Sequence, residues 1–163
     1  MNFKKLLPKA LIPFLVLLFV TPVLAYFIGS ANLLVDGNME NAGIADWGSL
    51  ISAVLSKQTS SPHSGTNWLK VLNVGGGNGA SYQEIMIIGK TYRVTGWARG
   101  DGGNGIPNIF QGSLRWIGTN SSDWQWFDET FTASSNDRLY FQIAHDGIGV
   151  YVGWDDIRVE EVL

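Results

Sequence analysis

One short stretch combines an aromatic ring with cations at a spacing that suits binding. From Thr91 to Arg99 successive residues of an extended strand point to opposite faces, so Arg93, Trp97 and Arg99 share one face. An indole between two guanidinium groups can stack on the C–H face of a sugar ring and hydrogen-bond to its hydroxyl groups. The same pattern also fits an ordinary half-buried tryptophan whose arginines extend past it to solvent.

Two later strands carry side chains of the same chemistry. Trp126 and Asp128 alternate with phenylalanines, and Tyr140 and Gln142 alternate with other apolar residues. The predicted ligand-binding residues are therefore Trp97, Arg99, Arg93, Trp126, Asp128, Tyr140 and Gln142, with Trp116 and Gln83 as further possibilities.

The remaining reactive side chains do not form a catalytic pattern. A glycosidase needs two carboxylates that face each other across a cleft at roughly 5 to 10 Å, but Asp128 and Glu129 are neighbours that point to opposite faces. His63 and His145 lack a third ligand at a zinc-like spacing. The glycine-rich loop from Gly100 to Gly105 does not open the helix that a dinucleotide site requires. The sequence therefore favours a protein that is not an enzyme.

Short apolar runs separated by Gly, Asn, Asp and Ser predict an all-β domain. No convincing helical period follows Ser30. The expected strands are Trp47 to Lys57, Asn67 to Val74, Ser81 to Ile88, Thr91 to Arg99, Ile109 to Ile117, Trp126 to Thr132, Arg138 to His145 and Val150 to Val162. Gly89 and Lys90 predict a tight turn between two antiparallel strands. This spacing favours a two-sheet antiparallel β-sandwich or jelly roll.

The first 25 residues have the layout of a secretory signal peptide. Three lysines precede an almost continuously apolar run from Ala10 to Leu24, and small residues stand near Ala25, where a signal peptidase would cut. A membrane anchor retained to about residue 29 is the alternative, because the apolar run is only slightly short for a membrane span. We expect residues 30–163 to form a secreted or cell-surface domain, which contacts a membrane only if the anchor is retained.

The charge of the chain excludes some partners. Three of the 11 Lys and Arg residues lie in the predicted leader, which leaves 8 basic against 14 acidic residues and a net charge near −6. An acidic domain without a basic run argues against nucleic acid and anionic membranes as partners. Because the chain has no cysteine, its stability would depend on the core and on any bound ion, and not on disulfides. The sequence does not fix the oligomeric state.

Three segments together resemble the β-jelly-roll carbohydrate-binding modules of the broad group with families 4, 9, 16 and 22. The first, Asn32 to Trp47, has Asn-Leu-Leu, a glycine, Met-Glu and a tryptophan, with Met39 in place of the usual Phe. The middle segment joins HSG at residues 63–65 to WLKV, YQEI and GKTYRVTGWAR. The last joins WQWFDETFTA to YVGWDDIRVEEV, so the similarity runs from Asn32 to Leu163.

The resemblance implies a bound polysaccharide and a structural calcium ion. The polysaccharide would lie against aromatic residues on a concave sheet face or in a loop cleft, and the ion would lie near the chain termini. Glu40 and one of Asp155 and Asp156 are the implied carboxylate ligands, with carbonyl oxygens near Gly37 and Ser64. Solvated carboxylates at the start of the last strand are the alternative interpretation of Asp155 and Asp156.

Two functions remain open from the sequence. The first is an exported, non-catalytic module that binds a polysaccharide or glycan whose identity the sequence does not give. The alternative is a structural or adhesive protein of a cell surface or virion, with the same fold and no affinity for sugar. A small hydrolase is less consistent with the residues than either.

Overall fold

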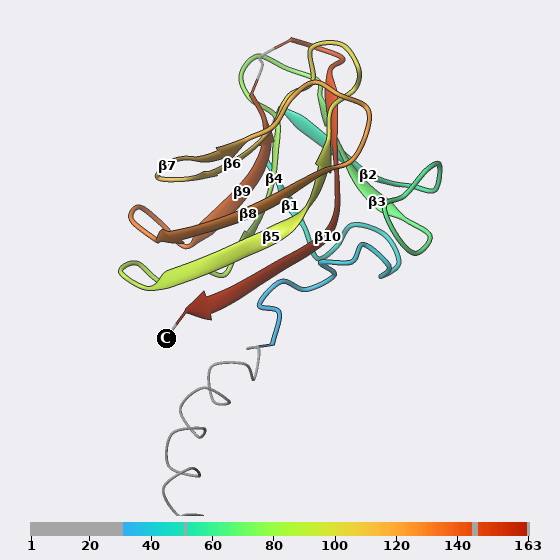
Figure 1. Cartoon of the computed structure of the whole chain (residues 1–163). Coiled ribbons are helices and arrows are strands. Elements are labelled where there is room, and N and C mark those ends of the chain that lie inside the picture. Colours follow the sequence, from blue (N-terminus) through green and yellow to red (C-terminus); the bar gives the residue numbers. More distant parts are fainter. Residues whose placement is uncertain (1–30, 51, 145–146, 163) are drawn as a thin grey trace, which may run out of the picture. The chain divides into compact units, whose positions relative to one another are not determined.

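The computed structural model describes residues 31–50, 52–144 and 147–162. The predicted leader at residues 1–25, with its possible extension to residue 29, lies outside them. Ten strands form two antiparallel sheets of five strands each, which confirms the predicted sandwich (Figure 1). In the described part of the chain, no helix is long and apolar enough to cross a membrane.

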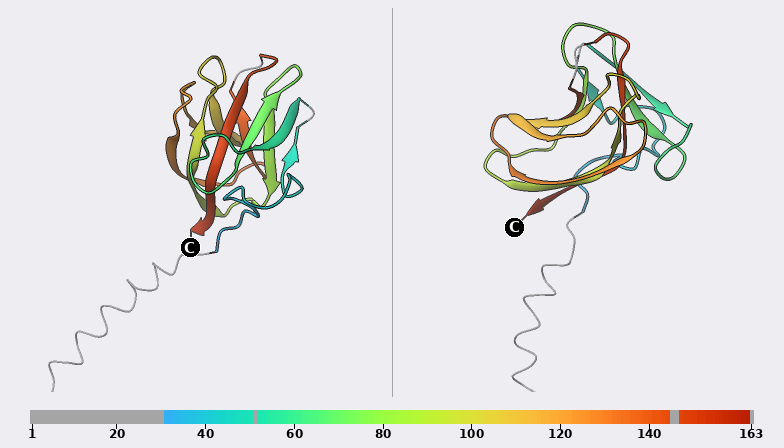
Figure 2. Two further views of the ribbon diagram at one scale, coloured as in Figure 1. Left: turned by 90° about the vertical axis from the view of Figure 1, so that its right-hand side faces the viewer. Right: turned by 45° about the horizontal axis from the view of Figure 1, so that its top comes forward.

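We call the two layers sheet A and sheet B. Sheet A consists, in spatial order, of β1 (Gly48–Ser49), β4 (Ala80–Glu84), β9 (Arg138–Ile143), β6 (Pro107–Gln111) and β7 (Ser113–Ile117). Sheet B consists of β2 (Ala53–Gln58), β3 (Trp68–Asn73), β10 (Tyr151–Val162), β5 (Thr91–Arg99) and β8 (Gln125–Thr132). Consecutive strands often lie in different sheets, so the chain crosses repeatedly between the layers (Figure 2).

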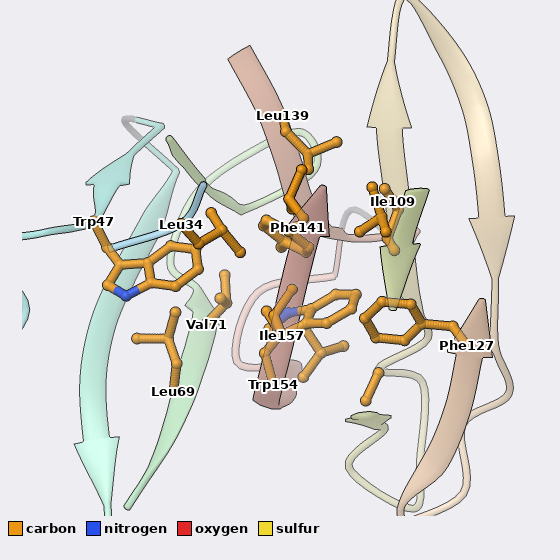
Figure 3. Packing of buried hydrophobic residues seen from close by; sticks show 14 of the residues in the cluster. Leu34, Trp47, Leu69, Val71, Ile109, Phe127, Leu139, Phe141, Trp154 and Ile157 are labelled. Atoms are coloured by element: carbon orange, nitrogen blue, oxygen red, sulfur yellow. The ribbon is translucent and has the colours of Figure 1, made fainter. Parts of the chain in front are cut away.

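The core lies between the sheets and follows the predicted alternation. Leu139 and Phe141 of sheet A meet Phe127 and Trp154 of sheet B (Figure 3). The Trp154 ring centre lies 5.3 Å from that of Phe141 and 5.9 Å from that of Phe127, both edge to face. Burying each such ring stabilises the fold by about 1.5–3 kcal/mol.

The predicted strand boundaries are wrong at three places, the first of which is the stretch from Ser81 to Ile88, where β4 already ends at Glu84. The stretch from Trp47 to Lys57 divides into β1 and β2, which belong to different sheets. The stretch from Ile109 to Ile117 folds back at Gly112, which has a φ of 69° that glycine adopts without strain, to form the pair β6 and β7.

The predicted turn at Gly89 exists, but the strands on its two sides do not pair. The amide of Lys90 donates to the carbonyl of Ile87 at 3.1 Å, as in a β-turn. However, β4 before the turn belongs to sheet A and β5 after it belongs to sheet B. The turn therefore connects the two layers instead of forming a hairpin.

The first described residues run beside the last strand. The amide of Leu33 donates to the carbonyl of Val159 at 2.9 Å, and the amide of Ile157 donates to that of Gly37 at 2.7 Å. The C-terminal end of β10 and the start of the described chain consequently lie at the same end of the sandwich (Figure 1).

Candidate functional site

A row of residues crosses all five strands on the outer face of sheet A. Directly paired residues of antiparallel strands project to the same face, and Tyr82, Tyr140 and Phe110 are paired in turn across β4, β9 and β6. Gly48 on β1 and Leu114 on β7 are the paired residues at the two ends. Four steps between neighbouring strands make this row roughly 19 Å long.

The three aromatic rings of the row are adjacent. The ring centre of Tyr140 lies 5.7 Å from that of Tyr82 and 6.4 Å from that of Phe110. A Cβ atom at Gly48 would lie 2.5 Å from the Tyr82 ring, so glycine allows that ring to extend over β1. We call Tyr82, Tyr140 and Phe110 the ring row.

A second row brings two amides together; it lies two residues along β4, β9 and β6 from the first row, and three residues along β7 because the β6–β7 register shifts. Asn108 on β6 and Gln142 on β9 are directly paired, and Ala80 and Ile117 lie beyond them on β4 and β7. Asn108 is only 5% exposed and Gln142 only 9%. Within the described residues, Asn108 Oδ1 is buried and has no hydrogen-bond partner, which is uncommon for a buried polar atom.

A depression of about 970 Å³ lies over these two rows, and we call it the cleft. Its lining contains the rings of Phe110 and Tyr140 and several aliphatic side chains, and none of the described lining residues is charged. Its amide side chains are those of Asn78, Asn108, Asn136 and Gln142. A smaller depression of about 410 Å³ next to Tyr82 contains the carboxylates of Asp46 and Glu84.

The charged residues at the Tyr82 end of the ring row pair with each other. Arg138 Nε donates to Glu84 Oε1 at 2.9 Å, and this hydrogen bond raises the pKa of Arg138 above its usual value. The guanidinium carbon of Arg138 lies 4.3 Å from the centre of the Tyr82 ring. One face of Tyr82 is thus covered by a cation whose charge is already balanced.

Five of the seven predicted ligand-binding residues lie together on the outer face of sheet B. Trp97 on β5 is directly paired with Trp126 on β8, and their ring centres are 5.3 Å apart. Arg93 donates to both carboxylate oxygens of Asp128, at 2.8 and 2.6 Å, and these hydrogen bonds lower the pKa of Asp128. Trp126 is 50% exposed, and Arg99 completes the five.

The loop between β2 and β3 covers part of this face. The His63 ring stacks on Trp97 with centres 4.0 Å apart and planes inclined by 17°. The guanidinium carbon of Arg99 lies 4.5 Å from the ring centre of Trp68 and 5.3 Å from that of Trp124. One face of Trp97 is therefore occupied by protein, and Trp126 is the most accessible ring of the predicted set on this sheet.

Tyr140 and Gln142 do not join the other five residues. They lie on the outer face of sheet A, which points away from the outer face of sheet B, so the seven predicted residues cannot contact one small ligand. Trp116, a further possibility, packs toward the core, with its ring centre 5.2 Å from that of Phe127. Gln83 is also buried, and its side-chain amide hydrogen-bonds to the backbone of Val35.

The sequence interpretation missed Asn108, Phe110 and Tyr82. Asn108 and Phe110 flank the fully buried Ile109, but the exposure of β6 does not alternate, since Phe110 is its one exposed residue. Tyr82 stands two residues before Glu84 on the exposed side of β4.

The predicted calcium ligands already accept hydrogen bonds from the protein backbone. Glu40 Oε1 accepts from the amides of Thr66 and Asn67, both at 2.8 Å, and these bonds lower the pKa of Glu40. Asp155 Oδ2 accepts from the amides of His63 and Ser64 at 2.9 and 3.3 Å.

The other predicted ligands, Asp156 and Gly37, also accept or share hydrogen bonds within the protein. Asp156 Oδ2 lies 2.7 Å from His63 Nδ1, and its Oδ1 accepts from the Ser64 hydroxyl at 2.9 Å. The carbonyl of Gly37 accepts the amide of Ile157. Both carboxylate oxygens of Glu40, Asp155 and Asp156 thus lie within hydrogen-bond distance of protein groups.

Lys57 binds the segment that precedes β1, which we call the N-terminal loop (residues 31–47). Lys57 Nζ lies 2.5 Å from Asp36 Oδ2 and 2.6 Å from the carbonyl oxygen of Met39. No group of three or more His, Cys, Asp or Glu side chains in the described ranges could hold a metal ion. The carboxylates of the predicted site are engaged by protein donors, and the calcium site stays a prediction from the sequence.

Comparisons with known proteins find similarity in structure only, since no family model and no curated protein sequence matches the chain. A family 16 carbohydrate-binding module superposes with a TM-score of 0.56 at 19% identity, over 78% of this chain and 99% of that module. A family 61 module in complex with β-1,4-galactotriose gives 0.55 at 18% identity, over 82% of this chain and all of the module (100%).

A third solved structure is much longer than this chain. An arabinose-bound family 51 α-L-arabinofuranosidase matches with a TM-score of 0.63 at 17% identity, over 82% of this chain but only 27% of the enzyme. At these identities the comparisons show a shared β-sandwich fold.

Proposed function

We propose that this chain, which has the β-sandwich fold of carbohydrate-binding modules, binds a polysaccharide or glycan in the cleft of sheet A without catalysing a reaction. The observation that carries the proposal is the pair of adjacent rings, Phe110 and Tyr140, which belong to the ring row and line the cleft. Aromatic rings stack on the C–H faces of sugars, while the amides of Asn108 and Gln142 can bond to hydroxyl groups. One similar module was solved with β-1,4-galactotriose bound, which is consistent with such a ligand.

The direction of the ring row suggests how a chain of sugars would lie. Tyr82, Tyr140 and Phe110 are on three neighbouring strands, so a ligand that follows the rings runs across the strands. These rings span two steps between neighbouring strands, roughly 10 Å, which is long enough for more than one sugar unit. We therefore expect affinity to rise with oligosaccharide length until the row is filled.

The predicted residues on sheet B remain a second candidate surface for the same class of ligand. Trp126 offers an accessible ring, and the Arg93–Asp128 pair beside it offers hydrogen-bonding groups. The cleft is the stronger candidate, because it is hollowed and contains two buried amides, whereas the neighbouring Trp97 is covered by His63.

Paired alanine variants test which face binds. Screening the purified chain on a glycan array identifies the ligand, and calorimetry on the strongest glycan measures affinity. We expect Tyr140→Ala to weaken binding about tenfold or more, since it removes the central ring of the row, while Trp126→Ala leaves affinity unchanged. The opposite result would move the site to sheet B. A native chain that binds no glycan would refute sugar binding and favour the structural or adhesive alternative.

We also propose that the chain acts outside the cell. The charged and then apolar layout of residues 1–25 supports export. The intact mass of the protein recovered from the culture medium or the cell surface would show whether the leader has been removed.

A further inference from the structure

On the premise that the cleft is a glycan site, its lining also indicates the class of glycan. We infer that the cleft selects uncharged glycans with a free hydroxyl group at its floor, and that Asn108 is the residue that determines this selection. The inference rests on the charge of the cleft, on the unpaired oxygen of Asn108 and on the apolar rim formed by β7.

The described lining of the cleft offers no partner to a charged sugar, because none of the described lining residues is charged. On the same sheet face, Arg138 is already paired with Glu84 through bonds of 2.8 to 2.9 Å. A uronate carboxylate that entered the cleft would lose water without gaining a cation, which is strongly unfavourable. A neutral sugar loses only hydroxyl hydration, which the amides can replace.

Asn108 presents an acceptor that lacks a donor. Its side chain is 5% exposed and lines the cleft, and its Oδ1 has no hydrogen-bond partner among the described residues. A buried acceptor without a donor is costly to the folded protein. Because Oδ1 itself has almost no exposed surface, a sugar hydroxyl donates to it only after the Asn108 side chain turns toward the cleft, whereas an O-methyl or O-acetyl group cannot donate at all. The position of Asn108 therefore favours a ligand with an unsubstituted hydroxyl group.

The rim of the cleft suits the apolar side of the same ligand. Leu114 and Ile117 on β7 are each about half exposed, and Phe110 is more than one third exposed. These side chains lie beside the amide of Asn108, which is paired with Ile117 across β6 and β7. A pyranose without charge presents both a C–H face and hydroxyl edges, so it matches this combination of apolar rim and polar floor.

Matched oligosaccharides test the inference on the native protein. The probes are the β-1,4-linked hexasaccharides of glucose and mannose, their glucuronate and mannuronate counterparts, and the permethylated neutral pair, each titrated by calorimetry. We expect a neutral member to bind about tenfold or more tightly than its uronate counterpart and its permethylated form, with little change as salt rises to about 0.5 M.

The outcomes separate this inference from the proposed function. A uronate that binds as tightly as its neutral counterpart, a permethylated sugar that binds as tightly as the free one, or an affinity that falls steeply with salt would overturn the selectivity and leave sugar binding intact. If none of the neutral, charged or methylated probes binds, both the proposed function and the inference fail for these backbones, and the glycan array decides whether the function survives with another.

Two variants of Asn108 test its role, with a substitution on sheet B as control. Asn108→Leu keeps the size of the side chain and removes the acceptor, and Asn108→Ala removes it with a smaller side chain. We expect both to weaken binding about tenfold or more, while Asn108→Leu leaves the melting temperature equal or higher, because an unpaired acceptor is lost. Thr130→Leu, on the outer face of sheet B, should change neither. A lower melting temperature with unchanged affinity in both Asn108 variants would assign the residue a structural role and overturn the inference.

Discussion

The buried carboxyl of Asp155 should make the domain less stable as the pH rises toward neutrality. Asp155 lies fully buried in β10, beside the bulge in its pairing with β5. Burial raises its pKa to about 6, although the amides of Ser64, His63 and Asp156 donate to its oxygens. The cost of removing the charge from water outweighs the favourable hydrogen bonds.

The direction of this pH dependence follows from the number of protons bound in the folded and in the unfolded state. In the unfolded chain an Asp has a pKa of about 3.9, so between pH 4 and 6 the folded state holds more protons than the unfolded one. The free energy of unfolding then falls as pH rises through this window. The contribution of Asp155 is fully present below about pH 4 and is lost above about pH 6.

The shift in the pKa of Asp155 sets an upper limit on this change in the free energy of unfolding. A displacement of about two units corresponds to about 3 kcal/mol. Asp155 adjoins the partly exposed Asp156, so nearby water screens its charge, and we expect a smaller effect of roughly 1 to 2 kcal/mol.

The assay is urea unfolding followed by tryptophan fluorescence at several pH values between about 4 and 7. Asp155→Asn is neutral throughout and keeps one of the two acceptor oxygens, so the pH dependence of its difference from the native chain reports the carboxyl group. We expect the variant to gain stability relative to the native chain as pH rises. A difference that stays constant across the window would refute the reasoning. Asp128 should not interfere, since its lowered pKa places its own titration below this range.

Two further predictions concern the N-terminal loop. Lys57→Met should lower the free energy of unfolding by about 3 kcal/mol or more, because it leaves the Asp36 carboxylate buried without its cationic partner. The Asp36 side chain is only 1% exposed. Denaturant unfolding would measure this loss, and the double variant with Asp36→Asn should recover part of it. Calorimetric melting should give the same midpoint in excess chelator and in millimolar calcium, because the Glu40 and Asp155 oxygens already accept backbone amides; a higher midpoint in calcium would support the ion predicted from the sequence.

The face that each side chain occupies could be predicted from the sequence, because strand alternation is local. Tyr92, Val94 and Ala98 are buried as expected, while Arg93 and Trp97 point outward from the same strand.

The sheet to which a strand belongs could not be predicted in this way. Trp97 and Tyr140 both point outward from their strands, yet they lie on opposite sides of the sandwich, because β5 pairs with β8 and β9 pairs with β4 and β6. The covering of Trp97 by His63 depends on a hydrogen bond between His63 and Asp155, which are 92 positions apart. Such contacts depend on the whole chain path, so no local pattern of residues reports them.

The ring row has a consequence for how binding can be detected. Its residues come from segments that are far apart along the chain, and only hydrogen bonds and packing hold these segments side by side. A sugar chain that touches several of them can do so only while the sheet is intact, so it binds the folded form and not the unfolded one. By mass action such a ligand raises the temperature of unfolding in proportion to the logarithm of its concentration above its dissociation constant. Thermal shift of the unlabelled protein thus becomes a screen for its ligand, and slowed amide exchange along the short strand β1 would show how far across the sheet that ligand reaches.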